Sequence, residues 1–194
     1  MDLSRNVPYK YSVSTLELMK KSKEENDKKE ADEFEKCKQE FKKQIYNCIM
    51  QALEQKKKPI DIIHSIFDEA NKYGQKNDMW KDNESFYFGL AQKWINMTLK
   101  YLWLFGKLPE YIEEKELDVP IDSYIIHAAM SDNDEYGLNI KVSGLRYKTS
   151  WSRMDEKLYG DVQKEIREKI GNKPFKTGIE WEQIAWIKQA KYEA

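Results

Sequence analysis

The sequence predicts an all-α protein. Gly and Pro are scarce, at 8 and 5 of 194 residues, whereas Lys, Glu and Gln are abundant, and this balance favours long helices over sheets. Every strong apolar repeat has the spacing of about 3.6 residues that one face of an α-helix requires. A chain of this length matches one domain. We expect a single helical domain over residues 29–194, more than half of it helical, after an N-terminal segment over residues 1–28.

The composition excludes several classes of protein. A formal net charge of −1 excludes a histone-like polycation but leaves room for a local basic cleft. No apolar run approaches the ~20 residues of a membrane span, and the N-terminal sequence MDLSRNVPYK lacks the apolar region of a signal peptide. We therefore expect a cytoplasmic protein with no membrane partner. Cys37 and Cys48 lie in one predicted helix, roughly 16 Å apart and beyond disulfide range, and two cysteines are too few for a four-cysteine metal site.

Three helices are predicted in the first half of the chain. Apolar residues recur at helical spacing over about 29–55. Pro59 suits the first turn of a second helix, which Gly74 can end. A third helix runs over about 88–105 and stops at Gly106. Their apolar faces comprise Ala31, Phe34, Phe41, Ile45, Cys48, Ile49 and Ala52; Ile62, Ile63, Ile66, Phe67, Ala70 and Tyr73; and Leu90, Ala91, Trp94, Ile95, Thr98, Leu99 and Leu102.

The next segments contain shorter elements. A short helix is expected after Pro109. Pro120 keeps the residue before it extended, and Asp122 occupies the N-cap position of the following helix. Residues 131–150 are the least helical stretch, and we expect a loop there with at most one small hairpin.

Two helices complete the chain. Ser152 and Asp155 form a capping pattern, and the apolar residues that follow keep helical spacing until Gly171. Beyond the loop NKPFKTG, a last helix carries apolar residues that include Trp181, Ile184, Ala185 and Ile187.

Lys93 and Asp122 have the clearest chemical potential, and each also has a structural alternative. Lys93 lies within the helix GLAQKWINMTLKYL, either as a solvated surface lysine beside Lys100 or as a partly buried amine. Burial lowers the pKa of a lysine and leaves some neutral nucleophile at neutral pH. Asp122 is either a helix cap alone or also a carboxylate at the mouth of a cleft, where it stabilises developing positive charge.

Other residues give weaker signals. His64 and His127 lack a metal-binding spacing and are expected to be structural, with a pocket-lining role for His127 as the alternative. Aromatic residues cluster around positions 80–88 and 94–103. They are expected to pack in the core, and the alternative is that those beside polar turns stack on an unpaired base. A small basic and aromatic patch suited to phosphate contact comprises Arg146, Lys148, Trp151 and Arg153. The sequence contains no Walker loop, dinucleotide fingerprint or GxSxG elbow.

Three segments, in order, resemble the helix-hairpin-helix superfamily of DNA glycosylases, and in particular its divergent archaeal 8-oxoguanine glycosylase type. Gln92-Lys93 matches the Gln-Lys pair that opens the helix after the hairpin, where the lysine is the nucleophile. Val119-Pro120-Ile121-Asp122 matches a turn whose aspartate is catalytic and caps the next helix. IEWEQIAWIK, residues 179–188, is similar to an acidic and apolar stretch near the C-terminus of the archaeal type.

The resemblance covers residues 84–190 and implies a helix-hairpin-helix fold, base excision from double-stranded DNA, and no cofactor or metal. Lys93 would attack C1′ of a flipped nucleotide, with or without strand cleavage, and Asp122 would stabilise the oxocarbenium-like sugar. Two helix N-termini would converge on this site and lower the pKa of Lys93. The expected substrate contacts are Gln92, Trp94, Trp151 and Trp186, and the expected DNA contacts are Gly89, Arg146, Lys148 and Arg153. We expect a monomer.

The sequence leaves the substrate and the function class open. By resemblance the excised base is 8-oxoguanine, and a bulky modified pyrimidine of phage DNA is the alternative. A non-catalytic helical module would bind DNA or a protein with Lys93 solvated and Asp122 only a cap, and a phage-defence protein could use the same scaffold. The near-neutral net charge favours a partner other than DNA, whereas the ordered Gln-Lys and Pro-Ile-Asp motifs favour the enzyme.

Overall fold

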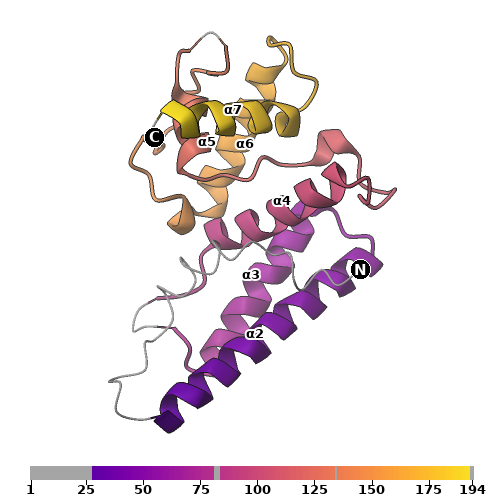
Figure 1. The fold of residues 1–194 in the computed structure, drawn as a ribbon, viewed down its shortest axis with the longest axis vertical. Helices are drawn as coiled ribbons and strands as arrows, with labels where there is room; N and C mark the ends of the chain where they lie inside the picture. Colours follow the sequence, from indigo (N-terminus) through magenta and orange to yellow (C-terminus); the bar gives the residue numbers. More distant parts are fainter. Residues whose placement is uncertain (1–27, 81–83, 134, 193–194) are drawn as a thin grey trace. The chain divides into compact units, whose positions relative to one another are not determined.

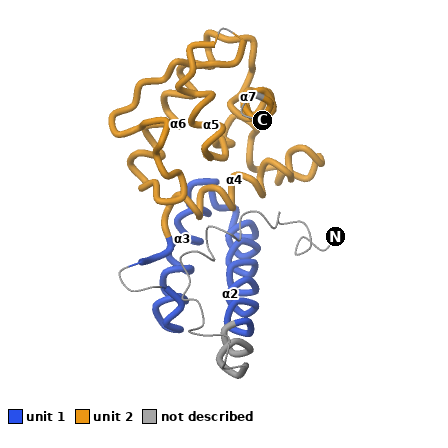
Figure 2. The backbone as a smooth tube through the Cα atoms, turned by 60° about the vertical axis from the view of Figure 1, so that its left-hand side comes forward, with its two compact units in different colours: residues 1–86 blue, residues 87–194 orange. Residues whose placement is uncertain are grey.

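The computed structural model describes residues 28–80, 84–133 and 135–192 (Figure 1). These residues form six α-helices and two short 3-10 helices and contain no β-strand, which confirms the predicted all-α class. The chain divides into two compact units, Met1–Phe86 and Tyr87–Ala194 (Figure 2), and the boundary lies close to the start of the predicted glycosylase-like part. All but the last residue of the expected N-terminal segment, 1–28, lies outside the described residues.

Unit 1 is built on two long helices. α2 (Lys28–Glu54) and α3 (Pro59–Lys76) pack side by side as an αα-hairpin (Figure 1). Both begin and end within two residues of the predicted bounds. Phe41 of α2 is buried against three aromatic rings, with centroid distances of 5.7, 5.8 and 6.3 Å to Tyr73, Trp80 and Phe86.

Gly74 does not end α3, so that part of the prediction was wrong. The helix continues to Lys76, and Gly74 lies against the indole ring of Trp80. A Cβ atom at position 74 would be 2.0 Å from Trp80 Nε1. The glycine therefore provides space for the tryptophan ring rather than a helix stop.

The central helix of unit 2 is α4 (Phe88–Leu104), which agrees with the predicted helix over 88–105. The 3-10 helix η3 (Trp151–Arg153) and α6 (Glu156–Ile170) both contact it. Its buried residues occupy nearly every side: Phe88, Gly89, Leu90, Ala91, Gln92, Lys93, Ile95, Asn96, Met97 and Leu99. A helix that is enclosed on all sides buries its polar residues as well, and this determines the environment of Lys93.

The short helix expected after Pro109 is a single 3-10 turn that begins five residues later, and no α-helix is described there. Ile112 N donates to the carbonyl oxygen of Pro109 at 2.9 Å in a turn, and the 3-10 helix η2 (Glu114–Glu116) follows. The side chains of Glu113 and Glu116 form a reciprocal capping box around this single turn, and the chain is extended again at the next residue. The capping hydrogen bonds enclose one turn, and the helix does not extend beyond that turn.

The loop predicted over 131–150 is present and contains no hairpin among its described residues. It follows α5 (Ser123–Met130), and its backbone donors return to the end of that helix. Asn139 N donates to Ser131 O at 2.8 Å, and Ile140 N donates to Ala129 O at 2.9 Å. Because a helix end accepts these hydrogen bonds, no partner strand is required.

The last two helices agree with the predicted order. Asp155 caps α6 by accepting from Leu158 N at 2.8 Å, whereas Ser152 belongs to η3 and not to the cap. α7 (Gly178–Tyr192) packs against α5 and α6. The buried Trp181 of α7 donates its indole N–H to Tyr136 O at 2.7 Å, which fastens the 131–150 loop to the helix.

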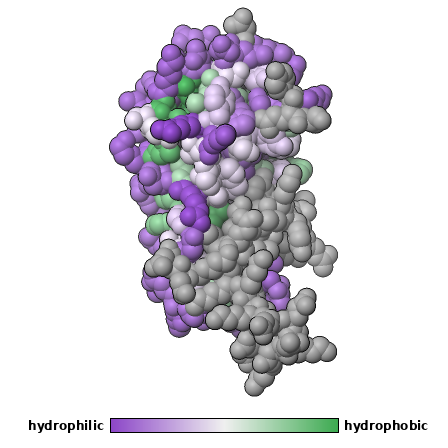
Figure 3. All heavy atoms as spheres, turned by 90° about the vertical axis from the view of Figure 1, so that its left-hand side faces the viewer, coloured by the Kyte–Doolittle hydropathy of each residue, from purple (hydrophilic) through white to green (hydrophobic). Residues whose placement is uncertain are grey.

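The surface reflects the high content of charged residues. On the face drawn in Figure 3, most coloured residues are hydrophilic, with smaller hydrophobic areas between them. The large apolar side chains that the structure exposes are Tyr46, Ile60, Leu104, Phe105, Tyr147, Ile184, Trp186 and Ile187. No described helix is long and apolar enough to cross a membrane.

Candidate active site

Asp122 caps α5, as the sequence predicted. Its backbone is extended, with φ −141° and ψ −173°, and its Oδ1 accepts a hydrogen bond from Ile125 N at 2.9 Å. This is the standard contact by which an N-cap side chain satisfies a free N–H group of the first turn. The cap uses only one oxygen of the carboxylate, so Oδ2 is available for other donors.

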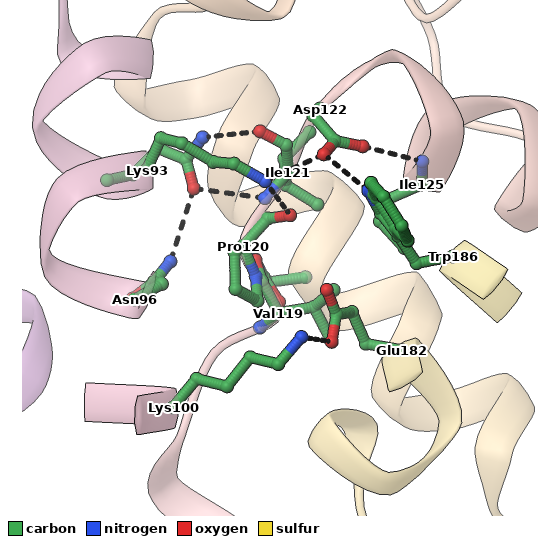
Figure 4. A network of polar contacts seen from close by, with 12 residues as sticks. Lys93, Asn96, Lys100, Val119, Pro120, Ile121, Asp122, Ile125, Glu182 and Trp186 are labelled. Carbon is green, nitrogen blue, oxygen red and sulfur yellow. Dashed lines mark hydrogen bonds and ion pairs between the residues drawn. The ribbon is translucent and has the colours of Figure 1, made fainter. Parts of the chain in front are cut away.

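Lys93 is one of the donors that reach this second oxygen. Its Nζ lies 2.8 Å from Asp122 Oδ2 and 3.2 Å from the carbonyl oxygen of Pro120 (Figure 4). The expected proximity of Lys93 and Asp122 is therefore confirmed. Lys93 is only 2% exposed, so the alternative of a solvated surface lysine was wrong.

Burial determines the protonation chemistry of Lys93. Desolvation lowers the pKa of its amine, and the charge of Asp122 acts in the opposite direction. Lys93 is the sixth residue of α4, beyond the N–H groups that the start of this helix leaves free, so of the two helix N-termini expected to lower this pKa only that of α5, which Asp122 caps, lies beside the amine. A lowered pKa raises the fraction of neutral amine, which is the nucleophilic form of a lysine.

Two glutamines hold the segment that leads into Asp122. Gln92 of α4 donates to Ile121 O at 2.9 Å and accepts from Ile121 N at 3.2 Å. Gln163 of α6 donates to Val119 O at 2.6 Å and accepts from Val119 N at 3.1 Å. We call these four residues the glutamine clamp. Each side-chain amide pairs with a backbone N–H and C=O as a neighbouring strand would, so the clamp holds the segment extended without a sheet.

The clamp corrects the expected role of Gln92. Its side chain is 0% exposed, and its amide oxygen also accepts from Asn96 at 3.2 Å. The Gln92 amide is therefore occupied by protein groups and does not reach a substrate. Gln92 instead positions the backbone that carries Asp122.

A buried polar network continues from the clamp into α6. Asn96 donates to the hydroxyl of Tyr159 at 2.9 Å, and that hydroxyl donates to Asp118 Oδ2 at 2.6 Å. Asp118 also forms an ion pair with Arg167. Burial raises the pKa of Asp118 and holds the pKa of Tyr159 well above its usual range, while Arg167 opposes the shift at Asp118. The buried Oδ1 of Asn96 has no hydrogen-bond partner among the described residues.

Lys100 and Glu182 form a second ion pair that sequence reasoning missed. Glu182 is 1% exposed and Lys100 is 13% exposed. Burial raises the pKa of Glu182, whereas Lys100 and then Lys93 lower it. Glu182 belongs to the stretch IEWEQIAWIK that carries part of the family resemblance, but a partner 82 residues away along the chain gives no local signal.

Of the expected substrate-contact tryptophans, the structure brings Trp186 to the Lys93–Asp122 pair. Trp186 Nε1 donates to Asp122 Oδ2 at 3.1 Å (Figure 4). The Trp186 ring also meets the Tyr124 ring edge-on, with a centroid distance of 5.4 Å. Trp94 follows Lys93 on α4 and is half-buried. Trp151 is half-buried in η3. Trp186 is thus the aromatic residue at the candidate site.

Gly89 is not available to hold a phosphate, which corrects its expected role as a DNA contact. Its N–H donates to Met154 O at 2.9 Å, and a Cβ atom at position 89 would lie 2.0 Å from Trp151 O. The glycine is therefore required for the close approach of η3 to α4. The three expected basic contacts, Arg146, Lys148 and Arg153, are all exposed, and the Arg153 guanidinium lies 5.2 Å from the ring centroid of Tyr87.

His127 has a local contact with the 131–150 loop. Its Nε2 lies 2.9 Å from Tyr147 O, and the two rings meet edge-on at 5.4 Å. His64 is half-buried in α3. The part of the chain that the structure describes contains no group of three or more His, Cys, Asp or Glu residues that could hold a metal ion.

No protein-family model matches the sequence, and neither a curated protein nor a solved structure matches it. The resemblance to glycosylases thus stays a prediction carried by three short motifs. A functional proposal depends on the geometry of Lys93, Asp122 and Trp186.

Proposed function

We propose that the protein is a DNA glycosylase in which Lys93 attacks the sugar of a modified nucleotide. The observation that carries the proposal is the buried Lys93 amine, 2.8 Å from a carboxylate that a helix cap holds in place. A general base must lie within hydrogen-bond reach of the proton that it accepts. The Lys93–Asp122 distance satisfies this requirement, and burial lowers the pKa of Lys93 in the direction that favours the neutral amine.

The proposed reaction begins with the neutral amine of Lys93. Its nitrogen bonds to C1′, the bond between C1′ and the base breaks, and the base leaves with the electron pair. Asp122 stabilises the positive charge that develops on the sugar, then takes a proton from the attacking nitrogen and passes it to the departing base. The nitrogen then forms a double bond to C1′ as the C1′–O4′ bond breaks, and its remaining proton passes to O4′. The resulting Schiff base is hydrolysed by water or permits β-elimination of the 3′ phosphate.

The exposed side of the site agrees with entry of a flipped nucleotide. Asp122 is 14% exposed and Trp186 is 36% exposed, whereas Lys93 is nearly enclosed. An indole ring at the entrance offers a face on which an extruded base can stack. We propose double-stranded DNA as the partner of a monomeric, cytoplasmic enzyme, with Arg146, Lys148 and Arg153 as exposed phosphate contacts.

Borohydride trapping tests this proposal directly, because reduction of the Schiff base links Lys93 to DNA permanently. The panel contains duplexes with 8-oxoguanine, with bulky modified pyrimidines and with unmodified bases. We expect trapping on one class of modified duplex, its loss in Lys93→Gln, and its retention in Lys157→Gln, a change of an exposed lysine on α6. Absence of trapping on every duplex, or equal trapping by Lys93→Gln, would contradict the proposal.

A second candidate function is a non-catalytic helical module that binds DNA or a protein. The near-complete enclosure of Lys93 favours it, because a buried ion pair also occurs as a structural element. In that case Lys93→Gln alters stability alone, and neither modified nor unmodified duplexes are trapped. The same set of variants therefore separates the two functions.

A further inference from the structure

Two ion pairs with buried members include lysines of the same helix, α4. Lys93 pairs with Asp122, and Lys100 pairs with Glu182 (Figure 4). The two lysines are seven positions apart on α4, which is two helical turns, and therefore share a face of the helix. We call these four residues the four-charge cluster.

The four charges act on one another beyond their own pairs. Asp122 and Glu182 both favour the charged form of Lys93, and Lys100 disfavours it. Lys100, Lys93 and Asp122 in turn act on Glu182. The cluster contains two positive and two negative groups when all four are ionised, so its formal charges then sum to zero.

Helix α7 contacts both ion pairs. Glu182 of α7 binds Lys100, and Trp186, one turn later on the same helix, donates to Asp122. α7 therefore contributes a charge to one pair and a hydrogen bond to the other.

We propose that Glu182 is a positioning residue for Lys93: by neutralising Lys100, it leaves Asp122 to hold the Lys93 amine in place. This role rests on the proposed function, since the position of the amine matters to catalysis only if Lys93 reacts. An ammonium group in a poorly hydrated interior needs a negative partner. Without Glu182, the charge of Lys100 is unbalanced on the same face of α4 and disfavours the Lys93 ammonium that Asp122 holds.

The test follows the titration of Lys93 itself and needs no activity. NMR of protein labelled with 15N-lysine reports the pH at which the Lys93 amine loses its proton, with Lys93→Gln to assign the signal. In Glu182→Gln we expect this pH to fall, because a negative charge is removed and Lys100 remains. Asp118→Asn is the matched control: it also removes a buried, ion-paired carboxylate, but Asp118 does not belong to the four-charge cluster.

A double variant keeps the test decisive if Glu182→Gln does not fold. Lys100→Gln with Glu182→Gln removes both charges of the second pair, a change that buried pairs often tolerate. We expect the double variant to fold and its Lys93 titration to stay near that of the wild type, because the charge that Glu182 neutralises is removed together with Glu182. A fall in Glu182→Gln that exceeds the control supports the proposal, and so does recovery of folding and of the wild-type titration in the double variant.

The proposal is overturned if the Lys93 titration in folded Glu182→Gln equals that of the wild type or of Asp118→Asn, or if the double variant is unfolded or its Lys93 titration departs from that of the wild type. That result would leave the Lys100–Glu182 pair with a structural role only. The proposed function fails separately, through the absence of Schiff-base trapping in the wild-type protein. The two failures are therefore distinguishable.

Discussion

Trp186 donates its indole N–H to Asp122 at 3.1 Å, on the same Oδ2 that accepts from Lys93. Both carboxylate oxygens are therefore in use, since Oδ1 caps α5. The three side chains differ in exposure, with Trp186 the most exposed and Lys93 the least. A ligand that approaches from solvent meets Trp186 and Asp122 before it meets the amine.

Asp122→Asn is expected to make folding stability rise more steeply with pH. Asparagine can still cap α5, but Lys93 loses its negative partner and its pKa falls further below the ordinary value of 10.5. Between the Lys93 pKa of the folded protein and that of the unfolded chain, the unfolded chain binds more protons, so folding stability increases with pH in that window. Below the folded-state pKa, the protein bears the full loss of stability that comes from burying a charged amine without a partner. Urea unfolding at a series of pH values measures this slope. Adding Lys93→Met should remove the extra slope, and an unchanged slope in Asp122→Asn would contradict the prediction.

Tyr159→Phe is expected to destabilise the fold by about 1–3 kcal/mol, because buried Asn96 and Asp118 each lose a hydrogen-bond partner. The ring volume hardly changes, so packing loss does not explain the effect. Urea unfolding with an unchanged m value is the measurement. Tyr136→Phe is the control, because its hydroxyl has a longer contact of 3.5 Å to Gln189 and its loss should cost less. Equal effects of the two substitutions would argue against the network.

Gly89→Ala and Gly160→Ala should change stability in opposite directions. At position 89 the new Cβ meets the backbone oxygen of Trp151, so η3 must move away from α4 and unfolding becomes easier. At the exposed position 160 in α6, nothing lies within 4 Å, and alanine should stabilise by about 0.5–1 kcal/mol. Thermal unfolding of both variants tests the pair. A stable Gly89→Ala protein would mean that η3 and α4 are not in close contact.

Gln163→Leu is expected to cost about 1–3 kcal/mol, because the buried N–H and C=O groups of Val119 lose their partner. Gln51 of α2 is exposed, and its replacement by leucine should change stability by less than about 0.5 kcal/mol. Denaturant midpoints of the two variants provide the comparison. Similar midpoints would show that Val119 does not depend on the glutamine.

Most of the helices could be predicted because their signals are local. The spacing of Ile62, Ile63 and Ile66 marks the buried face of α3, and Asp122 and Asp155 are caps readable from a few residues of sequence. The end of α3 was misjudged because Gly74 serves a contact with Trp80, which lies outside the helix. A glycine that provides space and a glycine that ends a helix look alike in sequence.

The interior of the candidate site could not be predicted to the same extent. Lys93 and Asn96 are polar residues of a largely apolar helix, and the sequence left Lys93 open between a solvated lysine and a partly buried amine. Asn96 meets Tyr159 of α6, 63 positions away, and Lys100 of the same helix meets Glu182 of α7, 82 positions away. The spacing of apolar residues along the chain does not indicate contacts between residues so far apart.

The glutamine clamp fixes the number of residues in the segment from Val119 to Asp122 as well as its extended shape. Val119 and Ile121 are anchored separately, to α6 and to α4, and the cap follows one residue later. A single inserted or deleted residue would leave one anchor bonded and shift the other, so Asp122 would no longer meet Lys93. An insertion scan should therefore find this segment intolerant, whereas Gly106, at the exposed turn after α4, should accept additional residues.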